Sequence, residues 1–572
     1  MNARLQRCLI GLLQHPRWAM LILLIAWLFS QKILHAVEIR AVDFGLVADG
    51  KTDDAPAIFQ VIAEAKKQSP SPVTIVFPKK KTIFAAAAEH RYLFYLRDAT
   101  NLTIDGGGST FLLDPRIRMA DLRGASTITM KNMMVDYTSS MFIETIVQEV
   151  HQEKSYLDVR PVDATESNNI RGATKEDGEQ WFGGFVWCEN GSNPKAARHF
   201  SVGKVERLDN GLIRIFHGEG SFTRDVAKCI IPGITTFSVP RSGVAHRHGP
   251  GALFEVHDVK DATLEHIHVW SAPWFAFSIY RCEGFCRFHD VDVVPKPHSA
   301  RRMSSCRDAF HVTANRARIS FEHCDTRGTG DDDYNFCILS STIRRVISPA
   351  EIVIRQKFPI QYNPMREGDT LMLMDSSNSM IGSAKIARYT ESPLKHGEIT
   401  PGGSCPEVTV RLDTPITGLR SGLTAWSREA CNPDTTMSHC TAAFSIRMQT
   451  SLTIKHCRFE CYNISYGMSE KNDNVEGPGP EFMRISHCQF HRGRGAGYHA
   501  QCDEAGSPET TRLQSIEIDH CFFYAPLKIA KANQIILLDN IFEDHVSLGI
   551  QSKLEIRGNR KHGFIFTMPL KK

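Results

Sequence analysis

The chain has 572 residues, of which 42% are hydrophobic and 23% are charged, a composition typical of a globular protein. Its 67 Lys and Arg nearly balance its 63 Asp and Glu, so the charge gives no indication of a nucleic-acid partner. The length allows either several domains or one long array of repeats.

Residues 1–36 differ from the rest of the chain. Arg4, Arg7 and Arg17 precede an uncharged, mostly apolar run over 18–31, which is shorter than the ~20 apolar residues that a membrane span needs. We predict a signal peptide over 1–36, with an uncleaved anchor as the alternative, and hence a secreted or periplasmic protein. No later segment has the pattern of a membrane span, so we expect none in the mature chain.

The segment VDFGLVADGKTDDAPAIFQVIAEAKKQ (42–68) predicts a helix. Its apolar residues fall on one helical face: Ile58, Val61, Ile62 and Ala65. Asp53 and Asp54 come just before this helix, where a carboxylate caps backbone N–H groups, and Pro56 suits the first turn. We therefore favour capping over catalysis for this acidic pair. Residues 37–144 are interpreted as N-terminal coils of a repeat, with this helix as a cap.

A repeat recurs along the chain. The clearest copies combine an alternating apolar strand, a His-Cys pair and a turn: RISFEHCDT (318–326), LTIKHCRF (452–459), MRISHCQF (483–490) and SIEIDHCFF (515–523). Short strands that recur every ~20 to 33 residues without helices between them indicate stacked coils. We predict an all-β protein, a right-handed parallel β-helix with inserted small antiparallel β domains.

The His-Cys pairs invite a zinc interpretation, but another explanation fits better. Cys324, Cys457, Cys488 and Cys521 share one repeat position, which Asn540 and Asn559 occupy in later coils. A position that accepts Cys or Asn at an inward turn indicates a ladder of small stacked side chains, and a buried thiol behaves as a small apolar group. We predict no metal site here.

Two stretches interrupt the coils. Residues 145–240 contain strand pairs such as KVERLDNGLIRIF (204–216), and residues 346–430 alternate like a small antiparallel barrel. We predict an inserted β unit in each stretch. Catalytic coils would then occupy 241–345, and C-terminal coils would occupy 431–572.

The segment GTGDDDYNF (328–336) places three carboxylates side by side. Asp308 precedes Asp331 by 23 residues, about one coil, so we expect Asp308 to lie beneath Asp331 and Asp332, one strand spacing away. Glycoside cleavage needs one carboxylic acid and one carboxylate, and crowding separates the proton affinities of neighbouring acids. On these residues alone, a calcium site and a solvated turn remain alternatives.

The order Asp308-Ala309-Phe310-His311, then Asp331-Asp332-x-x-Asn335, resembles the α-1,3-galactosidases that cleave terminal galactose from blood-group-B-type glycans (glycoside hydrolase family 110). Segments 246–273 and 357–373 resemble that family's coil before the site and its inserted barrel. The helix segment 42–68 resembles the opening of the pectin-lyase-like β-helix superfamily.

The resemblance implies an inverting enzyme without a cofactor or a catalytic metal. Asp331 would be the general acid, Asp308 and Asp332 would activate water, and Asp333 would have no catalytic role. Two departures concern sugar specificity: Cys337 stands where the family has His, and PWFAFSIY (273–280) replaces a glycine-rich segment. The signatures that follow the Asp pair in polygalacturonases are missing, which argues against pectin.

Four further residues are candidates for the sugar pocket: His311, Asn335, Trp270 and Trp274. Aromatic faces stack on sugar rings, although each of these side chains could equally pack between coils. We therefore expect a secreted, exo-acting hydrolase of glycans with terminal α-linked galactose. The alternatives are another β-helix glycosidase, a polysaccharide lyase, or a non-catalytic carbohydrate-binding or adhesion β-helix. The sequence makes no prediction of the oligomeric state.

Overall fold

The computed structural model describes residues 37–565 apart from residues 88, 171–182, 188–196, 219–223, 242–250, 357–363, 377–378, 392–406, 461–462, 467–476, 478, 492–497, 501–512 and 562–563. The predicted signal peptide, 1–36, lies outside the described residues, as do parts of the two segments 246–273 and 357–373. No helix within the described ranges is long and apolar enough to cross a membrane.

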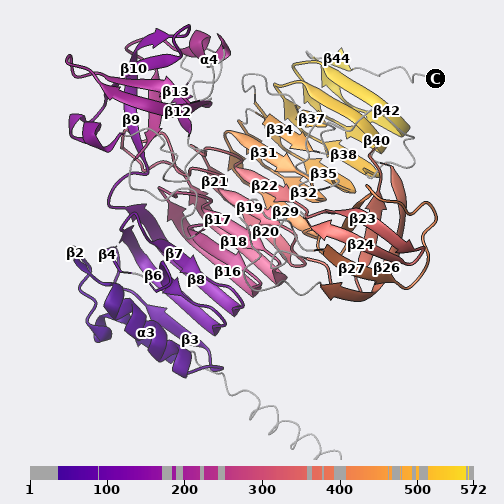
Figure 1. Ribbon diagram of the computed structural model, residues 1–572, viewed down its shortest axis with the longest axis horizontal. Coiled ribbons are helices and arrows are strands. Elements are labelled where there is room, and N and C mark those ends of the chain that lie inside the picture. Colours follow the sequence, from indigo (N-terminus) through magenta and orange to yellow (C-terminus); the bar gives the residue numbers. More distant parts are fainter. Residues whose placement is uncertain are drawn as a thin grey trace, which may run out of the picture.

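The chain winds through three columns of parallel strands (Figure 1). The first column contains β1 (Val37–Arg40), β3 (Val73–Val76), β20 (Arg318–Glu322), β29 (Thr435–Ser438), β32 (Leu452–Lys455), β35 (Phe482–Ser486) and β38 (Ser515–Asp519). The second contains β2 (Asp49–Asp53), β4 (Thr82–Ala85), β21 (Asp325–Thr326), β30 (Thr441–Ala442), β33 (Arg458–Phe459), β36 (Gln489–Phe490), β39 (Phe522–Phe523), β41 (Ile541–Phe542) and β43 (Arg560–Lys561), with β44 (Phe564–Ile565) antiparallel to β43.

The third column contains β5 (Tyr92–Tyr95), β7 (Arg118–Asp121), β15 (Phe254–His257), β17 (Phe277–Tyr280), β19 (Phe310–Thr313), β22 (Tyr334–Cys337), β31 (Ser445–Met448), β34 (Asn463–Tyr466) and β37 (Tyr498–Ala500). Long strands bend from the first column into the second: β6 (Thr100–Leu113), β8 (Ser126–Tyr137), β16 (Lys260–Val269) and β18 (Glu283–Val293). β40 (Leu527–Leu538) and β42 (Val546–Arg557) bend from the third into the first. The predicted parallel β-helix is confirmed.

Alternating side chains of each strand fill the interior of the coils. In the third column the first residue of four successive strands is aromatic: Phe254, Phe277, Phe310 and Tyr334. All four are buried, and their rings stack with centroids 4.7, 5.1 and 5.1 Å apart. The strand spacing therefore sets an aromatic stack that holds successive coils in register.

The turn between the first and second columns repeats one backbone conformation. In five coils the turn residue is a histidine with a φ between 51° and 56°: His323, His439, His456, His487 and His520. At the same turn Asp290 and Asp539 have a φ of 53° and 52°. The left-handed region tolerates His better than most side chains. The residue after each histidine is a buried Cys, and the backbone N–H of Cys457 contacts the Cys488 sulfur at 3.4 Å. The predicted ladder of small side chains is thus confirmed.

Two closed antiparallel barrels leave the β-helix on either side of its central coils (Figure 1). The first contains β9 (Phe142–His151), β10 (Tyr156–Pro161), β11 (Gly183–Trp187), β12 (Ala197–Arg207), β13 (Ile213–His217) and β14 (Thr236–Pro240), with η2 (Ala164–Asn169) and α4 (Arg224–Cys229) in its connections. The second contains β23 (Ser341–Ser348), β24 (Glu351–Gln356), β25 (Thr370–Met374), β26 (Met380–Glu391), β27 (Glu407–Leu412) and β28 (Thr424–Ser427). Each barrel has its own hydrophobic core.

The first coils carry η1 (Ala41–Phe44) and α3 (Ala55–Lys67), whose apolar face is buried as predicted. The acidic pair before α3 differs from the expectation. Asp53 accepts a hydrogen bond from the Ala55 N–H at 3.2 Å, but the Asp54 carboxylate turns back to the N–H groups of Val47 and Ala48. Asp54 therefore holds the preceding loop and does not cap the helix.

Candidate active site

Asp308, Asp331 and Asp332 converge where two successive coils enter the third column. Parallel pairing of Phe310 with Tyr334 places Asp308 one coil below Asp332. One oxygen of each of the three carboxylates lies within 4.8 Å of the others. The structure therefore brings the three predicted acids together.

Asp331 and Asp332 reach the same site because they are not in a regular strand. They lie in the bend before β22, so the alternation that would direct them to opposite faces does not apply. Gly330 allows this bend, since a Cβ on it would collide with the carbonyl oxygen of Cys306 in the coil below. The same Cβ would lie 2.8 Å from the ring of Phe185, which comes from the first barrel.

Asp332 is the most perturbed of the three acids. Burial raises its pKa to about 8, and the charges of Asp308 and Asp331 act in the same direction, whereas Arg447 lowers it. Ser445 donates a hydrogen bond to Asp332 Oδ1 at 2.6 Å, and Arg447 Nε lies 3.4 Å from Oδ2. Burial therefore favours the protonated form of Asp332.

Asp308 is also buried, with its side chain 3% exposed, and its Oδ2 lies 2.7 Å from His311 Nδ1. The His311 ring stacks on Phe275, with centroids 4.5 Å apart and planes 15° apart. His311, one of the predicted sugar-pocket residues, thus fixes the orientation of Asp308.

Asp331 is the most accessible of the three, with 35% of its side chain exposed. Its Oδ2 accepts a hydrogen bond from Arg307 Nη1 at 2.6 Å, and the Arg307 guanidinium lies 5.1 Å from the centre of the Trp274 ring. Trp274, another predicted residue, therefore supports the arginine that pairs with Asp331.

Asp333 has a structural task. Its buried carboxylate accepts hydrogen bonds from the N–H groups of Ala443 and Phe444 at 2.8 and 2.6 Å and from the Thr329 hydroxyl at 3.0 Å. Burial raises its pKa to about 7. Asp333 ties the acidic bend to the turn of the next coil and is not one of the converging acids.

A cavity of ≈ 450 Å³ lies on the outer face of the third column and reaches His311, the partner of Asp308. His311 and Trp274 line it, together with Phe275, Glu255, His257 and Ser278. His257 Nε2 contacts Glu255 Oε2 at 2.8 Å and Ser278 Oγ at 2.7 Å. Polar side chains and two aromatic rings thus surround a space large enough for a sugar ring.

Asn335 follows His311 in the same outward row, because the two residues pair across β19 and β22. Asn335 is buried, and within the described part of the chain its Oδ1 has no hydrogen-bond partner. A buried acceptor of this kind is costly unless a ligand or water satisfies it. Trp270, by contrast, lies after β16 with Lys296 Nζ 5.3 Å from its ring. It does not line this cavity, contrary to the prediction that it belongs to the sugar pocket.

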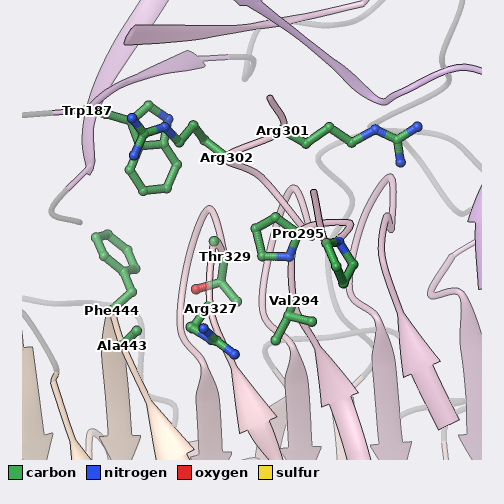
Figure 2. Close-up of a pocket in the computed structure, with 11 residues that line it drawn as sticks. Trp187, Val294, Pro295, Arg301, Arg302, Arg327, Thr329, Ala443 and Phe444 are labelled. Atoms are coloured by element: carbon green, nitrogen blue, oxygen red, sulfur yellow. The ribbon is translucent and has the colours of Figure 1, made fainter. Parts of the chain in front are cut away.

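A second cavity, of ≈ 360 Å³, borders the acidic bend. Figure 2 shows Trp187 and Arg302 above the coil turns that carry Thr329, Arg327 and Phe444. Thr329 belongs to the bend itself, since its hydroxyl contacts both the Asp331 carbonyl and Asp333. His311 therefore links Asp308 to the first cavity, and Thr329 links the acidic bend to the second.

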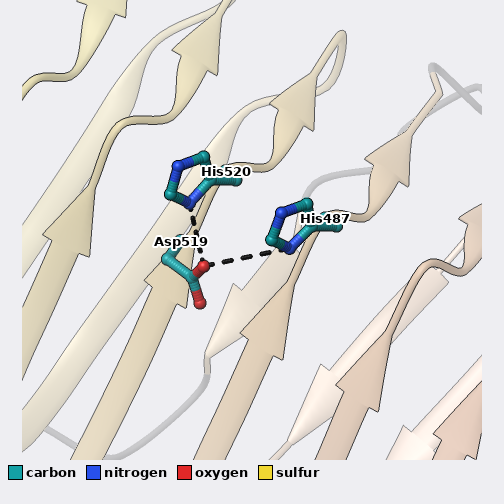
Figure 3. A group of neighbouring side chains, drawn as sticks. All are labelled: His487, Asp519 and His520. Carbon is teal, nitrogen blue, oxygen red and sulfur yellow. Dashed lines mark hydrogen bonds and ion pairs between the residues drawn. The ribbon is translucent and has the colours of Figure 1, made fainter.

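A different cluster lies on the histidine turns (Figure 3). His520 Nδ1 is 3.0 Å and His487 Nδ1 is 4.0 Å from Asp519 Oδ2. The two imidazoles are stacked 4.9 Å apart with planes within 5° of parallel, so one ion between them would lie outside both ring planes. This arrangement is a packing ladder and does not suit a metal ion.

Comparison with known proteins identifies relatives of this chain. No protein-family model matches the chain. Alpha-1,3-galactosidase B of Bacteroides thetaiotaomicron is 25% identical over 448 residues, which are 73% of this chain and 68% of that protein. Alpha-1,3-galactosidase A of Shewanella woodyi is 24% identical over 332 residues, 54% of this chain and 52% of that protein. The chain is a relative of proteins named alpha-1,3-galactosidase.

These relatives support a glycoside hydrolase. Among solved structures, the catalytic unit of a GH87 alpha-1,3-glucanase from Streptomyces thermodiastaticus aligns with 92% of this chain and 69% of that chain, with a TM-score of 0.36 and 9% identity.

Several residues of the site escaped prediction from sequence. Arg307 and Arg447 pair with Asp331 and Asp332, and Glu255 and His257 line the first cavity. Arg307 directly precedes Asp308 in the sequence, and this adjacency could have indicated that Arg307 belongs to the site. Arg447 lies 115 residues after Asp332, beyond the second barrel, and nothing in the local sequence connects the two.

Proposed function

We propose that the protein is a secreted, exo-acting glycoside hydrolase that releases terminal α-linked galactose with inversion of configuration. The observation that carries the hydrolase proposal is the convergence of Asp308, Asp331 and Asp332 within 4.8 Å. The sugar and its linkage come from the names of the relatives. Secretion rests on the signal-peptide pattern of residues 1–36.

The spacing of the acids supports a water held by two of them. Two oxygens no more than 4.8 Å apart can both accept hydrogen bonds of ~2.8 Å from one water molecule. In the proposal Asp308 and Asp332 hold this water, which attacks the anomeric carbon and gives up a proton to them. Asp331 gives a proton to the leaving oxygen, so one proton is donated and one is recovered.

The proton must reach Asp331 before it can be donated. In the ligand-free protein the raised pKa of Asp332 favours a proton on that residue, and Arg307 pairs with Asp331. The acids are close enough for one water to carry the proton between them, so the titration belongs to the cluster and not to one residue. In the proposal, a leaving oxygen bound beside Asp331 favours transfer of the proton from Asp332 to Asp331.

A retaining mechanism is the second candidate. Retaining pairs have carboxyl groups ~5–5.5 Å apart, and inverting pairs ~6.5–9.5 Å. The nearest oxygens of the three acids lie within 4.8 Å of one another, a proximity that a retaining pair also has. One Asp would then attack the sugar directly and form a covalent intermediate.

The terminal sugar would occupy the first cavity, which reaches His311. The Glu255, His257 and Ser278 side chains that line the cavity offer partners for sugar hydroxyls. The Asn335 oxygen, one strand beyond His311, has no partner among the described residues. Phe275 and Trp274 offer apolar surface for a ring face.

Hydrolysis of α-1,3-galactobiose, followed by proton NMR of the freshly released sugar, tests the proposal. We expect β-galactose first, with its α anomer appearing only through mutarotation. Asp308→Asn should reduce kcat/KM by at least ~10³-fold, whereas the exposed control Asp434→Asn should not. Release of α-galactose first would establish the retaining mechanism, and no release from any α-galactoside would refute the galactosidase proposal.

A further inference from the structure

The second cavity, which we call the arginine cavity, is lined by Trp187, Phe444, Arg301, Arg302 and Arg327 along with prolines and small residues, and among the described residues no carboxylate lines it. All three arginines interact with acidic residues outside the lining, Arg302 with the buried Glu144. Arg301 Nη1 lies 2.5 Å from the buried Asp136, and Arg327 pairs with Asp325. A guanidinium has five N–H donors in a fork, so one pairing leaves donors for a ligand.

The walls of the arginine cavity are joined by a hydrogen-bond chain. Trp187 Nε1 donates to Ser238 Oγ at 2.8 Å, and Ser238 Oγ donates to Glu144 Oε2 at 2.5 Å. Glu144 Oε1 accepts a hydrogen bond from the Arg302 N–H at 2.9 Å. The barrel therefore positions its tryptophan relative to the arginine loop before any ligand binds, which lowers the entropic cost of binding.

The position of the cavity relates it to the acids. Thr329 lines it and lies two residues before Asp331, and Phe444 lines it and is bonded through its N–H to Asp333. The first cavity reaches His311, the partner of Asp308. If the terminal sugar occupies that cavity, the leaving part of the glycan extends past Asp331 towards the arginines.

We propose that the arginine cavity binds an anionic sugar unit, carrying a sulfate ester or a carboxylate, on the leaving side of the scissile bond. The aromatic rings would pack on the sugar, and the guanidinium groups would bind the anion. This inference rests on the proposed function for its place in the reaction, but binding in the cavity does not depend on turnover. Guanidinium groups suit both anions because their paired donors match two oxygens.

Direct titration calorimetry tests binding without catalysis. The probes are methyl β-galactoside 6-sulfate, methyl β-galacturonide and neutral methyl β-galactoside, added to full-length protein at low ionic strength. We expect at least one charged probe to bind ~10-fold or more tightly than the neutral probe, with the difference shrinking at 0.5 M salt because exposed charges are screened. The charged probe that binds identifies the group.

Arg302→Gln and Arg327→Gln should each remove most of this preference. Arg484→Gln, which alters an exposed arginine of β35 outside the cavity, should preserve it. Thermal unfolding of each variant checks that it is folded. Equal affinity for charged and neutral probes, or a charge preference that survives both cavity substitutions in folded protein, would overturn the proposal.

An activity measurement separates the two proposals. The ratio of kcat/KM for an α-galactosyl disaccharide with a sulfated or acidic second sugar to that for its neutral counterpart should exceed ~10. Calorimetric binding without hydrolysis of either disaccharide would refute the galactosidase and leave the anion cavity standing. Hydrolysis of both disaccharides at equal rates, together with equal affinities for the charged and neutral probes, would support the galactosidase and refute the anion cavity.

Discussion

At the scale of single residues, three acids of one residue type occupy three different environments. Asp308 is buried against His311, Asp332 is buried near Arg447, and Asp331 is partly exposed beside Arg307. Burial opposes ionisation, and an adjacent cation or hydrogen-bond donor favours it. The division of roles among the acids therefore follows from their surroundings.

The first prediction concerns the identity of the acid. Asp331→Asn should lower kcat on a galactoside with a poor alkyl leaving group by ~10³-fold, but on a dinitrophenyl galactoside by less than ~10-fold, because a good leaving group needs no proton. Asp308→Asn should lower kcat strongly on both substrates, because the attacking water needs its carboxylate whatever the leaving group. Steady-state kinetics on the two substrates checks this prediction. If Asp332→Asn instead keeps its kcat on the dinitrophenyl galactoside while losing it on the alkyl galactoside, Asp332 is the acid.

The second prediction concerns stability and pH. The pKa of Asp332 is raised from 3.8 to about 8 on folding, so between these values the folded protein holds a proton that the unfolded chain has lost. Stability from this residue therefore falls as pH rises through that window, by up to ~1.4 kcal/mol per pH unit. Asp332→Asn cannot ionise, so its stability relative to wild type should increase from pH 5 to pH 8 in urea unfolding.

The opposite trend, or an unchanged difference between the two proteins, would contradict the burial argument. Asp434→Asn provides the control, because Asp434 is exposed and its removal should leave the pH dependence unaltered.

Some parts of the site could be predicted from the sequence, and others could not. The column of Asp308, Asp331 and Asp332 could be predicted because coil length fixes which residues stack. The Asp331 and Asp332 side chains share one face because of a bend, and that bend depends on contacts of Gly330 with Phe185 and Cys306. Such contacts join residues that are far apart in the chain, so local sequence patterns cannot predict them.

At the scale of the strand and its turn, the ladder joins each coil to the next. Asn540 Oδ1 accepts a hydrogen bond from the Cys521 N–H at 2.8 Å, and its Nδ2 donates to the Ile518 carbonyl at 2.8 Å. This position was predictable because Cys in the earlier coils and Asn in the later ones keep a fixed register with the strands. The barrels were predictable only as alternating strands, since strand order and closure depend on pairings that the pattern does not specify.

The third prediction tests the ladder. Asn540→Ala should destabilise the protein by ~2–5 kcal/mol, because buried backbone groups lose their partners at ~1–3 kcal/mol each. Asn533→Ala, which removes an exposed contact with Gln514, should cost less than ~0.5 kcal/mol. Urea unfolding of both variants measures the difference, and equal losses would show that the ladder adds nothing.

At the scale of the whole molecule, the first barrel packs on the β-helix beside the acids. Phe185 of β11 lies against Gly330, and Glu144 of β9 holds the backbone of Arg302 in the coil region. The acids therefore belong to the coils, while Trp187 in the arginine cavity and Phe185 beside Gly330 come from the insertion.

The fourth prediction tests this junction. Gly330→Ala should lower kcat/KM by at least ~10-fold, because the new Cβ displaces the bend that carries Asp331. Adding Phe185→Ala should restore activity only in part, since the Cys306 carbonyl still blocks the Cβ. Full recovery in the double variant would show that the barrel alone sets the bend, and unaltered activity in Gly330→Ala would show that the bend tolerates the added methyl group.

The position of the acids on the coils has an evolutionary consequence. A coil contacts mainly its neighbours in the stack, so an insertion can change wherever it does not touch the acidic bend, and the strands that position the carboxylates stay in place. Descendants of one ancestral β-helix can therefore diverge in the glycan they accept while the bond-breaking chemistry is inherited intact.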